Sequence, residues 1–272
     1  MVFGLSPSTD RVFRVAESAT LKVVGASKRF GGLQALDSVG ITVERGQIYG
    51  LIGPNGAGKT TFFNLITGLY VPDQGRFELQ GRAYEPRAVH EVVRAGIART
   101  FQNIRLFGEM TALENVMVGR HLRTRAGFLG AVLRLPGFRR EEREIADRAR
   151  ELLDYVGIGR LADFRARTLS YGDQRRLEIA RALATDPVLL ALDEPAAGMN
   201  ATEKQQLRAL IERIRADGRT LLLIEHDVKL VMGLCDRVTV LDYGRELAVG
   251  SPQEIQKDAR VIEAYLGTSG AH

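Results

Sequence analysis

Short apolar runs alternate along most of the chain with longer segments in which apolar residues recur at helical spacing. The apolar runs predict strands, which lie at Leu21–Val24, Ile48–Ile52, Phe77–Leu79, Val188–Leu192, Leu221–Ile224 and Val238–Leu241. The segments between them predict helices from Lys59 to about Thr67, over about Thr202–Arg215 and after Asp227. Because strands that alternate with helices pair in parallel, this pattern predicts an α/β fold built on a parallel sheet.

The middle of the chain, from about Pro86 to Ala184, is helical in pattern and has no apolar run comparable to the buried strands. We therefore expect a helical subdomain over about residues 103–184, inserted into an α/β domain of residues 19–268. Residues 1–18 mix Ser, Pro, Thr and isolated charges without a sustained period, which is typical of a flexible extension. Residues 269–272 are expected to form a short tail.

The composition is that of an ordinary globular protein, with 272 residues of which 45% are apolar and 26% charged. No apolar run approaches the roughly 18 residues of a membrane helix, and the N-terminus lacks the apolar core of a signal peptide. We therefore expect the chain to stay in the cytosol. The single cysteine, Cys235, excludes a disulfide within the chain and a cysteine-based metal site, and its apolar neighbours predict buried packing.

The net charge of the chain is +5, and one segment accounts for it, because Arg120–Arg150 has nine arginines and four acidic residues while the rest of the chain is balanced. A basic segment can face nucleic acid, anionic lipid or a protein partner. The alternative is a solvated helix pair, which the mixed charge signs along Arg139–Arg150 support, and the sequence leaves the choice open. Nucleic acid is not expected as a partner, because the segment lacks the interleaved aromatic residues that stack on single strands.

A phosphate-binding loop is predicted where the strand Ile48–Ile52 meets the following helix. Its sequence fits the pattern G-x-x-x-x-G-K-[ST] in the required strand-to-helix context, and the residues expected to hold phosphate are Gly53, Pro54, Asn55, Gly56, Ala57, Gly58, Lys59, Thr60 and Thr61. The glycines let backbone N–H groups and the positive end of the helix dipole point at phosphate oxygens. Lys59 adds a positive charge for the β- and γ-phosphates, and the Thr60 hydroxyl is placed to ligate Mg²⁺.

Two carboxylates, Asp193 and Glu194, follow directly after the strand Val188–Leu192. Ligands bind at the carboxyl ends of strands in open α/β sheets, so we expect both side chains near the phosphate loop. Asp193 is the expected Mg²⁺ ligand, usually through a water molecule, and Glu194 is expected to polarise the water that attacks the γ-phosphate. The alternative, in which the carboxylates merely end a strand and cap the next element, is less favoured beside a phosphate loop.

The segment Leu169–Gln174, with the sequence LSYGDQ, resembles the signature motif of the nucleotide-binding domains of ABC transporters. The other motifs of that family follow in the same order, and the similarity covers about Leu21 to Gly267. By this resemblance Phe30 stacks on adenine, Gln102 is the Q-loop glutamine and His226 is the switch histidine, while Ser170 and Gly172 form the signature.

This resemblance implies a P-loop NTPase core of the RecA type, with a parallel sheet, a small antiparallel β subdomain and the inserted helical subdomain. It also implies an ATPase that uses ATP and Mg²⁺. The expected catalytic residues are Glu194, His226 and Gln102, and the expected metal-binding residues are Thr60, Gln102 and Asp193. In the family the signature meets ATP held by the opposite subunit, so the resemblance makes dimerisation part of the mechanism.

Some of these assignments compete with simple packing. Phe30 precedes two glycines and also fits a core aromatic residue before a turn, and a lone histidine such as His226 is more often a core residue. Tyr171, Asp173 and Asn200 stand where the family usually has Gly, Gln and Asp. These departures leave the contacts between subunits open.

Longer runs resemble a narrower group, the ATP-binding subunits of bacterial branched-chain amino-acid importers, and within it the subunit with the longer helical insert. The runs are LSYGDQRRLEIARAL, DEPAAGMN, RTFQNIRLFGEMTALENV and VIEAYLG. This resemblance implies a second ATP-binding subunit, identical or paralogous, two transmembrane permease subunits and, indirectly, a periplasmic or extracellular binding protein. It also implies a peripheral position on the cytoplasmic face of the bacterial inner membrane.

The alternative function is the ATPase of another ABC importer or of a lipid or lipopolysaccharide exporter. A soluble ABC ATPase of translation or DNA maintenance is less suitable, because the chain has neither a second such domain nor a long coiled coil. Ile104, Leu106 and Phe107, which follow Gln102, are expected either to receive a helix of a membrane subunit or to pack internally.

Overall fold

The computed structural model describes residues 19–121 and 136–267. The predicted N-terminal extension, the C-terminal tail and part of the basic segment Arg120–Arg150 lie outside these residues. Within the described ranges, none of the helices combines the length and the apolar composition needed to cross a membrane.

The central sheet has six strands in the order β10-β9-β3-β8-β7-β6. They are β3 (Ile48–Ile52), β6 (Ile97–Arg99), β7 (Leu189–Asp193), β8 (Thr220–Ile224), β9 (Arg237–Asp242) and β10 (Arg245–Gly250). The four predicted strands of this sheet, β3, β7, β8 and β9, pair in parallel, and β10 adds an unpredicted antiparallel edge beside β9. The other two predicted strands, Leu21–Val24 and Phe77–Leu79, pair antiparallel in a second sheet. Strand β6 corrects the expectation that the stretch from Pro86 to Ala184 lacks a buried strand, because it pairs with β7 through the buried Ile97 and Ala98.

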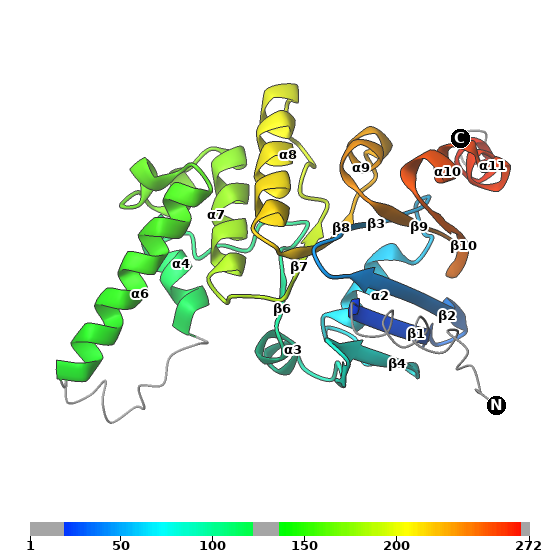
Figure 1. Cartoon of the computed structure of the whole chain (residues 1–272), viewed down its shortest axis with the longest axis horizontal. Helices are drawn as coiled ribbons and strands as arrows, with labels where there is room; N and C mark the ends of the chain where they lie inside the picture. Colours follow the sequence, from blue (N-terminus) through cyan, green and yellow to red (C-terminus); the bar gives the residue numbers. More distant parts are fainter. Residues whose placement is uncertain (1–18, 122–135, 268–272) are drawn as a thin grey trace, which may run out of the picture.

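A second sheet is antiparallel, in the order β2-β1-β4-β5, with β1 at Ala19–Phe30, β2 at Leu33–Glu44, β4 at Gln74–Leu79 and β5 at Arg82–Ala83. It lies on one side of the central sheet together with helix α2 (Lys59–Ile66), as Figure 1 shows. This is the small β subdomain that the family resemblance implied. Strands β1 and β2 form a long hairpin with several register shifts, and half-exposed, irregular strands of this kind leave little alternation in the sequence.

Alternate residues of the central strands point into two separate cores, as the pleat of a strand requires. Tyr49 and Leu51 of β3 join the core formed with α2 and the antiparallel sheet. Ile48 and Ile52 join the opposite core, which the helices α7 (Tyr171–Leu183), α8 (Ala201–Ala216) and α9 (Val228–Leu234) cover. Cys235 is buried in this second core, as its neighbours predicted.

The remaining helices extend the molecule at both ends (Figure 1). At one end α4 (Ala112–His121) packs against α6 (Pro136–Tyr155) and α7, and two short 3-10 turns, η1 (Gly159–Leu161) and η2 (Ala166–Thr168), connect α6 to α7. We call α4, α6 and α7 the helical lobe. At the other end lie α10 (Pro252–Lys257) and α11 (Ala259–Gly267), the last described helices. Helix α3 (Val89–Ala95) precedes β6 and lies away from both ends.

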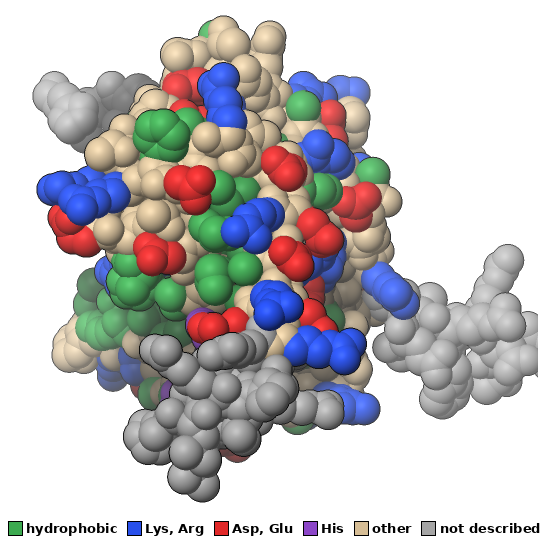
Figure 2. All heavy atoms as spheres, turned by 90° about the vertical axis from the view of Figure 1, so that its left-hand side faces the viewer, with side chains coloured by type: hydrophobic (Ala, Val, Ile, Leu, Met, Phe, Trp, Pro, Cys, Tyr) green, Lys and Arg blue, Asp and Glu red, His purple; other side chains and the backbone are tan. Residues whose placement is uncertain are grey.

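The described part of the basic segment has mixed charge. Helix α6 has ion pairs between Arg140 and Glu144 and between Arg148 and Glu151. Figure 2, which faces the helical lobe, shows basic and acidic side chains interspersed over this surface. Among the described residues, this pattern favours the solvated-helix alternative over a uniformly basic patch.

Candidate functional site

The phosphate loop connects the fully buried strand β3 to helix α2, as predicted. Two of its glycines are required by close contacts. At Gly53, with φ of 151°, an added Cβ would lie 2.1 Å from the carbonyl oxygen of Leu241, and at Gly58, with φ of 99°, it would lie 2.9 Å from that of Ala35. Only glycine fits these two positions, so the loop is held tightly against β9 and β2.

Lys59 is the first residue of α2 and its side chain turns back into the loop. Its Nζ donates hydrogen bonds to the carbonyl oxygens of Gly53 (2.7 Å) and Pro54 (2.8 Å). Burial lowers the pKa of the Lys59 ammonium, and the negative charge of Glu194 opposes that shift. The ammonium is therefore held at the start of the helix, where an anion would meet it.

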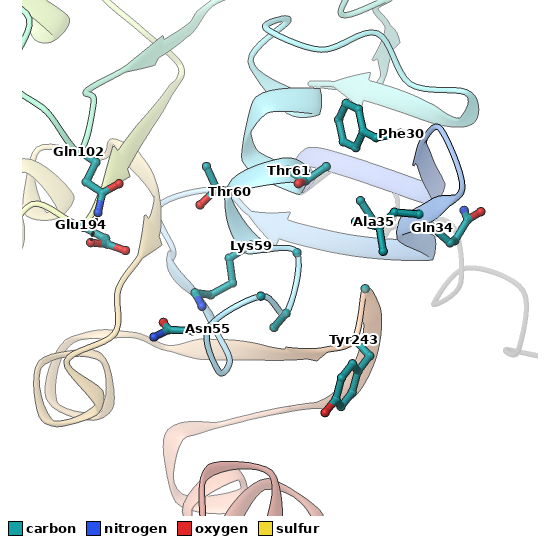
Figure 3. A pocket seen from close by; sticks show the side chains of 15 residues that line it. Phe30, Gln34, Ala35, Asn55, Lys59, Thr60, Thr61, Gln102, Glu194 and Tyr243 are labelled. Atoms are coloured by element: carbon teal, nitrogen blue, oxygen red, sulfur yellow. Dashed lines mark hydrogen bonds between the residues drawn. The ribbon is translucent and has the colours of Figure 1, made fainter. Parts of the chain in front are cut away.

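An open cleft of about 580 Å³ runs from the antiparallel sheet past the phosphate loop. Its lining includes many of the predicted residues, namely Phe30, Asn55, Gly56, Ala57, Gly58, Lys59, Thr60, Thr61, Gln102 and Glu194. Figure 3 shows Phe30 at one end and Gln102 with Glu194 at the other, with Lys59 and Thr60 between them. Gly53 and Pro54 form the base of the loop behind this lining.

The cleft also has lining residues that were not predicted, which are Leu33, Gln34, Ala35, Tyr243 and Gly244. The first three begin β2, directly after the Phe30 turn. Tyr243 and Gly244 form the two-residue turn between β9 and β10, both with positive φ. Only Gly244 hinted at this turn in the sequence, because the usual hairpin pairs are Asn-Gly, Asp-Gly and Gly-Gly and tyrosine rarely takes a positive φ.

Phe30 lies at the edge of the cleft with 41% of its surface exposed. Its ring meets Tyr70 edge-to-face with 5.2 Å between the centroids, and the Lys28 ammonium lies 5.5 Å from its centroid. This position does not fit the alternative in which Phe30 packs in the core. It leaves an aromatic ring available to a ligand at that end of the cleft.

Three predicted catalytic side chains converge at the other end of the cleft. Glu194 Oε2 accepts a hydrogen bond from Gln102 Nε2 at 2.8 Å and lies 3.5 Å from His226 Nδ1. The His226 side chain is 59% exposed, so it is not a core histidine. The Glu194 backbone has φ of 43°, a left-handed conformation that is uncommon outside glycine, and its N–H donates to the carbonyl oxygen of Ile224 at 2.9 Å.

Asp193 lies deeper than predicted, because it is only 3% exposed and is not part of the cleft lining. Its Oδ2 accepts a hydrogen bond from Arg99 Nη2 at 2.8 Å. Burial raises the pKa of the Asp193 carboxyl, and the Arg99 charge and hydrogen bond oppose that shift. The Arg99 guanidinium also donates to Asn64 and Thr67 of the α2 region, so it connects this carboxylate to the helix that follows the phosphate loop.

Arg99 was not singled out in the sequence. Its guanidinium carbon lies 4.6 Å from the ring centroid of Phe63 and 4.8 Å from that of Phe101, so the side chain is enclosed by two aromatic rings. Only its position three residues before Gln102 could have suggested that Arg99 belongs to the site, because the sequence does not distinguish a buried arginine from an exposed one.

The expected metal-binding residues present only oxygen donors, a hydroxyl from Thr60, an amide from Gln102 and a carboxylate from Asp193. No group of three or more His, Cys, Asp or Glu side chains in the described residues could hold a metal ion by itself. Mg²⁺ is usually bound by one or two carboxylates together with substrate phosphates rather than by an all-protein cage. Thr60 and Gln102, which line the cleft, therefore fit a magnesium ion that arrives with a phosphorylated ligand, whereas the buried Asp193, paired with Arg99, would reach that ion only through a water molecule.

Ser170 and Gly172 lie at the start of α7 and do not line the cleft. Ser170 is the N-cap residue of α7: its Oγ accepts from Asp173 N at 3.2 Å and donates to Asp173 Oδ2 at 2.8 Å. A Cβ added at Gly172 would lie 2.8 Å from Glu203 Oε1, so the helix start packs closely on α8. The structure thus separates the signature from the phosphate loop of the same chain.

The apolar residues after Gln102 are only partly exposed. Leu106 packs against the core, whereas Phe107 is 49% exposed beside the Arg181 guanidinium. Met110 and Phe164, from segments joined to this one by hydrogen bonds, are also exposed. Phe107, Met110 and Phe164 therefore give the segments beside the helical lobe a small apolar surface, which we call the surface around Phe107.

Comparisons with known proteins agree with this geometry. A family profile described as ABC transporter matches residues 36–197, and one described as branched-chain amino acid ATP-binding cassette transporter matches residues 245–271. The high-affinity branched-chain amino acid transport ATP-binding protein BraF of Pseudomonas aeruginosa is 48% identical over 248 residues, which cover 91% of this chain and 97% of that protein. The protein of the same description named LivG, from Escherichia coli strain K12, is 47% identical over the same shares of both chains.

A solved structure is similar as well. The ADP conformation of MJ1267, an ATP-binding cassette of an ABC transporter, superposes with a TM-score of 0.80 at 32% identity. The superposition covers 92% of this chain and 99% of that chain.

Proposed function

The chain belongs to the ABC transporter family, and from this premise we propose that it hydrolyses ATP to energise an importer of branched-chain amino acids. The observation that carries the hydrolytic role is the convergence of Gln102 and His226 on Glu194 at the end of the phosphate-loop cleft. The proposed substrate rests on the names of relatives such as BraF and on the profile matched by residues 245–271.

Binding of ATP begins at the phosphate loop. The backbone N–H groups of residues 55–61 and the start of α2 meet the phosphates, and Lys59 gives up its loop carbonyl partners to contact the β- and γ-phosphates. At the opposite end Phe30 stacks on the adenine ring. The length of the cleft between these residues supports this orientation.

Hydrolysis takes place at the Glu194 end. The Glu194 carboxylate accepts a proton from a water molecule as the water oxygen attacks the γ-phosphorus, and the bond to ADP breaks. Gln102 and His226, both close to Glu194 Oε2, orient the water and the γ-phosphate. Thr60, Gln102 and Asp193 would hold Mg²⁺, which neutralises charge that develops on the phosphate oxygens.

The ATPase acts as part of a larger assembly. Ser170 and Gly172 contact the nucleotide of a second ATP-binding subunit, a role that their separation from the phosphate loop supports. Two permease subunits hold the pair on the cytoplasmic face of the cell membrane, and the surface around Phe107 receives a helix from one of them. In this proposal residues 19–268 form one nucleotide-binding domain and residues 103–184 its helical subdomain.

Purification of the complex from its native membrane tests this proposal. A tag on this chain should recover two permease subunits and an ATP-binding subunit, identified by mass, and the complex should hydrolyse ATP. The complex carrying Glu194→Gln should bind ATP but hydrolyse it about 10²-fold more slowly, because the amide cannot accept the proton. Recovery of the chain without permeases would contradict the proposal, and so would an unchanged rate in the variant.

A further inference from the structure

Helix α7 contains a buried ion pair that the chemistry at Glu194 does not use. Arg175 and Glu178 are 0% and 1% exposed, and their side chains are 2.8 Å apart between Nη1 and Oε2. Burying two charges costs free energy that a hydrophobic pair would avoid, so such a pair needs further hydrogen bonds to compensate.

Those hydrogen bonds go to the backbone on either side of the Phe101–Gln102 peptide bond. Arg175 donates to the carbonyl oxygens of Phe101 (2.5 Å) and Gln102 (2.8 Å), and Glu178 accepts from the N–H of Phe101 (3.1 Å). The Gln102 side chain meanwhile reaches Glu194, as Figure 3 shows. One residue therefore contacts the catalytic carboxylate through its side chain and helix α7 through its backbone.

The same guanidinium contacts the first turn of α7. Arg175 Nη2 donates to the Tyr171 hydroxyl at 3.1 Å. The Tyr171 ring lies against Gly198, where an added Cβ would come within 3.3 Å of it. Gly198 belongs to the segment that follows Glu194, so Tyr171 lies against that segment while Arg175 contacts the segment that contains Gln102.

We propose that Arg175 and Glu178 are positioning residues that fix Gln102 to helix α7, so that Gln102 and the helix N-cap Ser170 move as one unit. This inference rests on the proposed function, in which Gln102 meets the nucleotide of its own chain and Ser170 that of the second subunit. A nucleotide that draws in Gln102 thereby moves Ser170 as well. Tyr171, which replaces the usual glycine, extends the unit to Gly198.

The double variant Arg175→Met/Glu178→Gln separates this role from a contribution to folding. The amide oxygen introduced at position 178 still accepts from Phe101 N, and the two paired charges leave together, so the fold should persist. The half-buried Arg181 loses the nearby charge of Glu178, so a moderate decrease in stability is expected. The carbonyl oxygens of Phe101 and Gln102 lose the donor that Arg175 supplies. The matched control is Arg148→Met/Glu151→Gln on α6. These two residues form an exposed ion pair of the same i,i+3 spacing, on a helix other than the one that contacts Gln102.

The readout is kcat and KM for ATP in the complex purified from membrane. We expect the Arg175/Glu178 double variant to lower kcat about 10-fold or more with KM changed less than about 3-fold, because it displaces Gln102 without touching the phosphate loop. The control should match the unmodified complex. A purely structural role would instead lower the unfolding temperature and leave kcat unchanged at temperatures where the protein is folded, and that result would overturn the inference.

A double-mutant cycle that combines the Arg175/Glu178 variant with Gln102→Ala identifies the residue through which the ion pair acts. If it acts through Gln102, the pair variant should cost little further kcat in the Gln102→Ala background. Fully additive losses would contradict the inference. Should the double variant not fold, Arg175→Lys keeps the charge beside Glu178 while one ammonium cannot serve both carbonyls, and the same kcat loss is expected. Absence of ATP hydrolysis in the unmodified complex would count against the proposed function instead.

Discussion

At the scale of single residues, the proposed site combines groups expected to bind phosphate with groups expected to act on water. Lys59 is buried in the phosphate loop with two carbonyl partners, whereas His226 is largely exposed beside Glu194. The two residues are therefore expected to affect different steps, although both belong to the same cleft region.

Substitution of each residue separates these steps. Lys59→Ala removes the phosphate-facing charge and should weaken ATP binding by about 10-fold or more, whereas His226→Ala should leave the Kd within about 3-fold and lower kcat. Equilibrium ATP binding and steady-state hydrolysis measure the two effects. If His226→Ala instead unfolds the protein at working temperature, the role of His226 is structural.

How much of the site the sequence predicts depends on whether a residue carries a pattern. The phosphate loop and Glu194 were found because motif spacing and a strand end mark them, and Gln102 and His226 were found through the resemblance to the ABC family. The structure brings these residues together. Arg99 and Arg175 were missed because nothing in the sequence distinguishes a buried arginine from the many exposed ones. Their roles depend on partners far along the chain.

At the scale of elements, strands that contain an apolar run were predicted, and strands without one, namely β2, β5, β6 and β10, were not. Strands β3, β7 and β8 are buried along their whole length and stand out as apolar runs. Strand β6 has only three residues, and it forms because β7 offers a buried edge rather than because of its own composition. Local sequence could not predict a strand that tertiary pairing creates.

The turn from β3 into α2 allows a direct test of this packing. Gly53→Ala would bring its Cβ to 2.1 Å from Leu241 O, whereas Gly56→Ala has φ of 80° but nothing within 4 Å of its Cβ. We expect the Gly53 variant to lose about 3 kcal/mol or more of unfolding free energy, and the Gly56 variant about 1–2 kcal/mol from backbone strain alone. Urea unfolding measures both, and equal losses would contradict the packing argument.

At the scale of the whole molecule, the two parts that we propose contact nucleotide, the phosphate loop and the signature, lie in different places. The phosphate-loop cleft lies beside the sheets, and Ser170 begins a helix of the lobe outside that cleft. The family assignment made from the motifs is confirmed by the matching profile and by relatives whose similarity to this chain extends over 97% of their own length. A pair of such chains would bring each signature to the other's cleft.

The surface around Phe107 gives a prediction at this scale. Phe107→Asp places a charge on the proposed permease contact, so it should reduce transport per ATP hydrolysed while leaving the Kd for ATP within about 2-fold. Ile262→Asp is the control, because Ile262 is comparably exposed, at 46% against 49%, and lies on α11 at the opposite end of the molecule. Transport coupled normally in the Phe107 variant would rule out this contact.

Uptake of labelled leucine, isoleucine and valine by native cells lacking this chain is the most direct test of the central claim, that ATP hydrolysis at Glu194 drives import. We expect high-affinity uptake to be lost in these cells, restored by the unmodified chain, and not restored by Glu194→Gln expressed at the same level, because the amide cannot accept the proton of the attacking water. Normal uptake in the absence of the chain would contradict the importer assignment. Full restoration by Glu194→Gln would contradict the assigned role of Glu194.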